Sequence, residues 1–107
     1  MTVSASSSVA GHRVARSLGL VYGNTIRARH VGRDILAALK NVVGGEIEEY
    51  TKLMAEAREQ AIDRMVAQAA SRGANAVVDV RFSTSYIMGS ASEILAYGEA
   101  VTLEKSE

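Results

Sequence analysis

The chain has 107 residues and a mass of 11.4 kDa, and its twelve basic and twelve acidic residues leave no net charge. It contains no cysteine, which excludes disulfides, thiolate nucleophiles and thiolate metal sites, and which fits a reducing compartment. No run approaches the roughly 20 apolar residues of a membrane span, and the first residues lack an export signal. We therefore expect one cytoplasmic domain over residues 1–107 with no membrane partner.

The composition predicts a small and marginal core. Aromatic residues make up 5% of the chain, with no tryptophan and a single phenylalanine, Phe82. General area relations give roughly 5,800 Å² for a compact monomer of this mass, with about 65% of the chain's surface buried on folding. Contacts between copies of the chain would add the missing burial, so we expect a homo-oligomer.

Charge is divided unevenly along the chain. Residues 1–45 have a net charge of +5, with Asp34 as their only acid, and the remainder has a net charge of −5. This division fits a nucleic-acid surface or pairing between subunits. The basic residues are Arg13, Arg16, Arg27, Arg29, Arg33 and Lys40. Because they lack interleaved aromatic residues and a recognisable binding module, we consider nucleic acid the weaker explanation.

The first half of the chain predicts strands and a short helix. Residues 2–9 are Ser-rich and fit an edge strand or a loosely held arm. Residues 12–29 are rich in strand formers, and Gly23-Asn24 is a turn signal, so a bent strand or a hairpin is expected. Apolar residues at helical spacing then predict a helix over residues 33–43, which Gly44-Gly45 ends.

A second, longer helix is predicted from about Glu46 to Arg72, with Gly73 after its end. Its apolar arc contains Ile47, Tyr50, Leu53, Met54, Ala57, Ala61, Met65 and Ala69. Arg58 falls near the middle of this arc, where an unpaired guanidinium would be costly. We expect it to pair with a carboxylate: Asp34 first, Asp79 second, of the same or a neighbouring chain.

Two strands are predicted to close the chain, at residues 76–82 and 93–103, joined by a Ser-rich connection over residues 83–92. Both faces of the last strand are apolar. The helices would cover one face of the sheet, and the sequence predicts no other element that could cover the opposite face. A partner subunit is therefore the expected cover.

Several segments together resemble the YbjQ-like family of small bacterial and archaeal proteins, whose function is not established. They are Arg33-Asp34, Val43-Gly44-Gly45-Glu46, Ala57-Arg58-Glu59, Gly73 to Val78 and Ala96-Tyr97-Gly98. The resemblance implies an α+β, two-layer β-α-β-β subunit similar to dodecin subunits, in which a short and a long helix cover a small sheet. It also implies ring-shaped pentamers, which can pair. Asp79, Ser83 and Glu99 depart from the family pattern, which expects glycine, an acid and threonine there.

The family is sometimes described as heavy-metal-binding, which makes a metal ion the one candidate cofactor. The weak candidate ligands are His12 and His30, with Met54, Met65 and Met88 on separate elements. We favour surface histidines and core methionines over a site within one chain. Symmetry between subunits can still bring one histidine from each copy together.

Other patterns gave no stronger site. Glu56, Glu59 and Asp63 share one helix face, where a solvated surface is favoured over a hard-cation site. Three acids follow Gly44-Gly45, which disfavours phosphate binding there, and no serine lies in a nucleophile turn. Two hypotheses remain: a homo-oligomeric structural or binding module with a small ligand or metal at intersubunit clefts, or an enzyme of unknown chemistry with its site in those clefts. We lean against an enzyme and assign no catalytic or cofactor-binding residue.

Overall fold

The computed structural model describes residues 1–28, 45–87 and 91–106. Side chains are described for residues 1–26, 52–86 and 92–106. The helix expected over residues 33–43 lies outside these ranges, as do Asp34, His30 and Met88.

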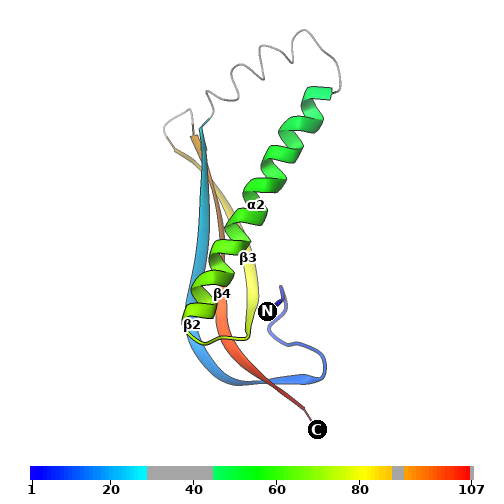
Figure 1. The fold of residues 1–107 in the computed structure, drawn as a ribbon, viewed down its shortest axis with the longest axis vertical. Coiled ribbons are helices and arrows are strands. Elements are labelled where there is room, and N and C mark those ends of the chain that lie inside the picture. The colour runs from blue at the N-terminus through cyan, green and yellow to red at the C-terminus, as the bar shows by residue number, and fades with distance from the viewer. Residues whose placement is uncertain (29–44, 88–90, 107) are drawn as a thin grey trace.

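The chain forms one four-stranded sheet with a long helix packed against one face (Figure 1). The elements are β1 (Thr2–Val3), β2 (His12–Ala28), α2 (Gly45–Ser71), β3 (Ala76–Ile87) and β4 (Ala91–Lys105). The strand order is β1-β3-β4-β2, with β1 parallel to β3 and the other neighbours antiparallel. The predicted α+β class is confirmed, and the short N-terminal strand is an edge strand.

β2 runs for 17 residues without a break, so the hairpin alternative for this segment is wrong and the bent strand is correct. Gly23 stays within the strand and pairs with Ala96 of β4. A side-chain carbon at Gly23 would collide with backbone atoms of Ala61 and Met65 in α2. This glycine therefore serves a close helix–strand approach rather than a turn.

The core lies between α2 and the sheet. Four residues of the predicted apolar arc are fully buried: Ala57, Ala61, Met65 and Ala69. They pack with apolar side chains of all three long strands: Val21, Val77, Val80, Ile94, Ala96 and Ala100. Small side chains dominate this set, so the helix and sheet backbones lie close together. The arc is confirmed over this half of the helix.

Polar side chains of α2 also bind the outer edge of β2. The backbone N–H of Tyr22 donates to Oε1 of Gln68 at 2.8 Å. Arg64 donates to the carbonyl oxygen of Asn24 at 2.5 Å. Arg72 donates to the carbonyl oxygens of Leu20 at 2.7 Å and Leu18 at 3.4 Å. Side chains of the helix therefore supply hydrogen-bond partners to the backbone in the middle part of β2.

The opposite face of the sheet, which we call the open face, is covered at one end by the chain's own N-terminal segment. Val9 and Leu103 pack against the buried Ala76, Val78 and Val101. The carbonyl oxygens of Ser6 and Ser4 accept hydrogen bonds from the backbone N–H groups of Asp79 and Val80 at 3.1 and 3.0 Å. The expectation that nothing in the chain covers this face is thus wrong at this end.

The C-terminal hairpin is confirmed, but it is longer than predicted. β3 and β4 stay paired out to the Ile87–Ala91 match. Residues 83–87 and 91–92, which the sequence predicts as part of a Ser-rich connection, therefore belong to the two strands. Phe82, Thr84 and Tyr86 share one face of the strand, and the two small serines between them share the other, a period of two that is typical of a strand.

We expect Gly23→Ala to lower the stability of the protein, because the added methyl group must displace the backbone of α2. Overpacking of this kind costs about 1–3 kcal/mol. Thermal unfolding at fixed protein concentration, followed by circular dichroism, measures it. Ser8→Ala, a change at an exposed residue, is the control that should leave the midpoint unchanged, and an unchanged midpoint for Gly23→Ala would contradict the close-approach role.

Candidate functional site

A shallow groove of about 440 Å³ crosses the uncovered part of the open face. Its lining residues come from two paired strands: Leu20, Tyr22 and Asn24 of β2, and Glu93, Leu95 and Tyr97 of β4. Tyr22 lies directly opposite Tyr97 in the strand register. Alternation along each strand sends these side chains to the open face while their neighbours enter the core.

The floor of this open-face groove is apolar and accessible to solvent. Leu20 is 63% exposed and Tyr22 51% exposed, and Ile26 on the same side of β2 is 58% exposed. Leu95 and Tyr97 are half-buried. A contiguous apolar surface of this kind marks an interaction or ligand-binding site more often than plain solvent-facing sheet.

Carboxylates lie at both ends of the groove. Nδ2 of Asn24 donates to Oε2 of Glu93 at 3.0 Å. A second hollow of about 340 Å³ shares Leu20 and Tyr97 with the groove and adds Asp79 and Glu99. Among the residues whose side chains are described, Arg13 and Glu104 form the one ion pair. No described basic side chain therefore pairs with Glu93, Asp79 or Glu99.

The second hollow contains Asp79 and Glu99, where the family resemblance leads us to expect glycine and threonine. Asp79 has a φ of 55°, a left-handed conformation that glycine adopts freely and that aspartate tolerates better than most residues. It lies where the β3–β4 register shifts between Val78 and Arg81. Oε1 of Glu99 accepts a hydrogen bond from the Ser17 hydroxyl at 2.5 Å. This end of the face is therefore more acidic than the expected glycine and threonine would make it.

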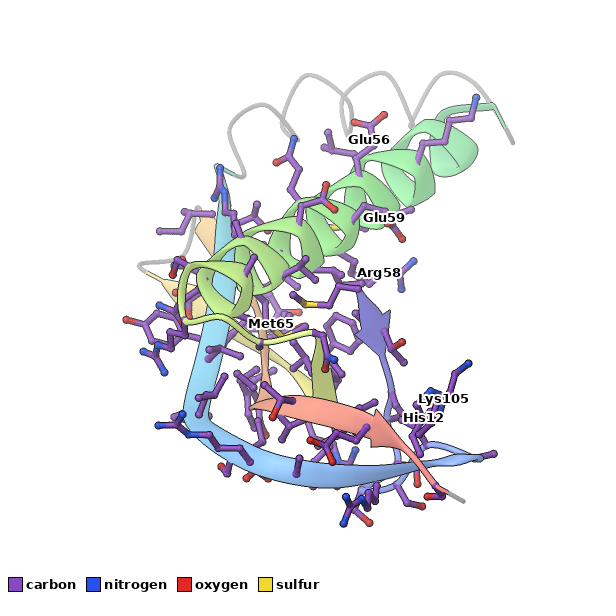
Figure 2. The ribbon with its side chains drawn as sticks, turned by 60° about the horizontal axis from the view of Figure 1, so that its bottom comes forward. His12, Glu56, Arg58, Glu59, Met65 and Lys105 are labelled. Carbon is purple, nitrogen blue, oxygen red and sulfur yellow. The ribbon has the colours of Figure 1, made fainter. Side chains whose placement is uncertain are left out.

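The predicted metal ligands do not come together in the described part of the chain. His12 is exposed at the start of β2, opposite Lys105, and its Nδ1 lies 3.0 Å from the carbonyl oxygen of Ala10. Met65, on the side of α2 that faces the sheet, is fully buried (Figure 2). Within the described residues, no three His, Cys, Asp or Glu side chains are grouped as metal ligands.

Glu56, Glu59 and Asp63 of α2 are exposed, as expected for a solvated face. Glu56 and Glu59 lie with Lys52 along the helix surface that faces away from the sheet (Figure 2). Of the basic residues on β2, Arg13 is paired to Glu104 at 2.7 Å and Arg16 is exposed.

Arg58 is exposed, so its predicted burial within the single chain is wrong. It has no ion pair to Asp79, the second candidate partner, and Asp34 lies outside the described residues. The cause is the position of the helix: α2 packs mainly over β2 and β4 and barely touches β3. The part of the apolar arc that contains Arg58 therefore extends past the sheet it was expected to meet.

None of the described helices is long and apolar enough to cross a membrane.

Comparison with known proteins agrees with this architecture. A family described as "Putative heavy-metal-binding", the YbjQ family, matches residues 1–104. A UPF0145 protein of Dehalococcoides mccartyi is 58% identical over 104 residues, covering 97% of this chain and all of that protein. One from Archaeoglobus fulgidus is 55% identical over 101 residues, covering 94% of each chain. These relatives carry no assigned activity in their names.

A solved structure shows the same fold at low sequence identity. It is a protein of unknown function of the DUF74 family from Pediococcus pentosaceus, with a TM-score of 0.63 and 11% identity, covering 97% of this chain and 98% of that one. The family match and the close relatives together establish that this chain belongs to the YbjQ (UPF0145) family.

Proposed function

We propose that the protein is a homo-oligomeric binding module, in which a neighbouring copy closes the open-face groove into a cleft for a small ligand. The observation that most supports this proposal is the apolar floor of the groove, formed by Leu20, Tyr22, Leu95 and Tyr97. Closing the groove removes this surface from water and leaves room for a ligand, since binding pockets typically measure about 300–1,000 Å³.

The surface area of the single chain supports self-association. The chain exposes 7042 Å², whereas a compact monomer of this mass is expected to expose roughly 5,800 Å². The difference is of the same order as the roughly 800 Å² that each partner contributes to a standard interface. The radius of gyration, 17.4 Å, also exceeds the roughly 13 Å of a compact domain of this length.

The groove suggests what chemistry its ligand would have. An apolar body would cover the Leu20–Tyr97 floor, and a positive charge would meet Glu93 at one end or Asp79 and Glu99 at the other. Soft heavy metals prefer sulfur and imidazole ligands, and the described lining has neither. An apolar cation therefore fits the groove better than a heavy metal does.

Two alternatives remain from the sequence. An enzyme with an intersubunit site would use the same cleft, and its carboxylates would be the candidate acid–base groups. A heavy-metal site would need ligands from several chains, such as one His12 from each. Native mass spectrometry and elemental analysis of the purified protein distinguish an organic ligand from a metal.

We propose a pentamer of about 57 kDa, the ring size that the family resemblance implies, and a pair of rings as the larger form. Leu20→Asp should shift the mass measured by light scattering towards 11.4 kDa, because it places a charge in the closed groove. Ala70→Asp introduces the same charge on an exposed position of α2 and should leave the mass unchanged. A wild-type monomer, or equal masses for both variants, would contradict the proposed interface.

Arg58 provides a second test of assembly. It is exposed in one chain although it lies in the apolar arc of α2, so we expect a carboxylate from a neighbouring copy to reach it. Arg58→Ala should reduce the oligomer mass, and Arg58→Lys should restore it only in part, because lysine lacks the planar fork that binds a carboxylate with two hydrogen bonds. Full assembly of both variants would show that this arginine is not an interface residue.

We also predict no submicromolar binding of Zn²⁺ or Cu²⁺ by a single subunit, since thiolates are absent and His12 stands apart from other described ligands. Titration calorimetry of the dissociated Leu20→Asp variant measures this directly. Tight binding that disappears in a His12→Ala, His30→Ala double variant would establish the metal site instead.

A further inference from the structure

The sheet has two outer edges, and the first of them, on β2, is largely closed. Gln68, Arg64 and Arg72 of α2 bind its backbone from Leu18 to Asn24. Before that stretch, the register with β4 shifts twice, between Val14 and Arg16 and between Ser17 and Gly19. Irregular edges and occupied backbone groups both oppose the addition of another strand.

The second edge is closed over its first part by the N-terminal segment. β1 pairs with Ala76 and Val77, and the backbone of Ser4 and Ser6 continues the contact as far as Val80. Nη1 of Arg81 then donates to the carbonyl oxygen of Ala5 at 2.7 Å.

Beyond Arg81, β3 runs on as an open edge from Phe82 to Ile87. Within the described residues, no hydrogen bond is recorded to the outer side of this stretch. Every side chain from Phe82 to Tyr86 is exposed, and Phe82 and Tyr86 are 48% and 79% exposed. The segment FSTSYI contains no charge, proline or glycine. Natural sheets place such features on exposed edges to prevent strand addition, and this edge lacks all of them.

We propose that two copies of the chain join through this edge, with the two β3 segments paired antiparallel across a two-fold axis at Thr84. A head-to-tail contact between strands needs two different open edges on each chain. The described residues offer one long, regular open edge, the Phe82–Ile87 stretch of β3. A single open edge can pair only with its own copy, and this is the defining property of a two-fold interface. The two four-stranded sheets then become one continuous sheet.

The side chains favour this axis over its neighbours. With Thr84 on the axis, Phe82 faces Tyr86 of the partner subunit, so two aromatic pairs form on the same face of the sheet as α2, beyond the part that the helix covers. Cross-strand aromatic pairs are among the favourable ones in sheets. Ser83 then faces Ser85 of the partner subunit. An axis at Ser83 would instead bring Tyr86 against Val80, whose edge the N-terminal segment already occupies.

This edge contact is separate from the open-face contact of the proposed function. The open-face groove uses side chains of β2 and β4, whereas the edge uses the backbone of β3. A chain that makes both contacts has its ring neighbours and, in addition, one partner related by the two-fold axis. The edge contact therefore predicts that two rings associate. It rests on the proposed function only in requiring self-association.

Disulfide trapping tests the proposal cleanly because the chain has no cysteine of its own. Residues opposite each other in an antiparallel pair have Cα atoms about 4.5–5.5 Å apart, within the range that a disulfide spans. Thr84→Cys, oxidised at dilute concentration, should give a covalent dimer. Arg16→Cys, at an exposed position on β2, is the control that should remain monomeric on a denaturing gel.

A second pair of variants measures which residues lie opposite each other, and it still tests the proposal if Thr84→Cys fails to fold. Ser83→Cys and Ser85→Cys should link to each other when mixed and refolded together, and each alone should link at least tenfold more slowly. Equal rates for Thr84→Cys and Arg16→Cys, or faster linkage of a Thr84→Cys and Arg16→Cys mixture than of Thr84→Cys alone, would overturn the two-fold edge. A wild-type monomer in light scattering would overturn the proposed function, whereas a large mass without linkage would overturn only the edge.

Discussion

The close approach of α2 to β2 at Gly23 is the constraint on which the rest of this subunit depends. Because position 23 has no side chain, the helix backbone at Ala61 and Met65 lies directly against the strand. Small residues on the helix and on β4 allow the same closeness along the core. This packing buries little area for each residue, since the contacts are made by alanines and valines rather than by aromatic side chains.

The position of the helix determines what remains uncovered. α2 packs mainly over β2 and β4 (Figure 1). Phe82 and Tyr86, on the outer part of β3, are therefore exposed. On the open face, the N-terminal segment covers the end near Val78 and leaves the groove around Tyr22 and Tyr97. Both uncovered regions are apolar, and they lie on different sides of the sheet. These two regions are the surfaces that the proposed assembly would remove from solvent.

Local patterns in the sequence were sufficient for most of the fold. The C-terminal half of the apolar arc of α2, the C-terminal hairpin and the α+β class all follow from side-chain periodicity and are confirmed by the structure. Gly23-Asn24 was misinterpreted because a glycine in a turn and a glycine beneath a helix have the same local signature. Serine is common in turns, so the sequence favours a loop over residues 83–87, whereas pairing with β4 holds these residues in a strand.

The candidate site was harder to predict from the sequence than the fold. The two apolar faces of residues 93–103 indicated an uncovered surface, but the groove also requires the register that places Tyr22 opposite Tyr97. The meeting of Asp79 and Glu99 in one hollow likewise depends on pairing between distant strands. Arg58 was expected to be buried because a helical wheel describes the helix alone and does not show where the sheet beneath it ends.

Small-angle X-ray scattering tests most directly whether the chain completes its burial through its own copies. The single chain has a radius of gyration of 17.4 Å and a mass of 11.4 kDa. At micromolar concentration, we predict a radius of gyration clearly above that value and a forward-scattering mass that is a multiple of 11.4 kDa. A radius near 17.4 Å with the mass of one chain, unchanged across concentrations, would contradict the account.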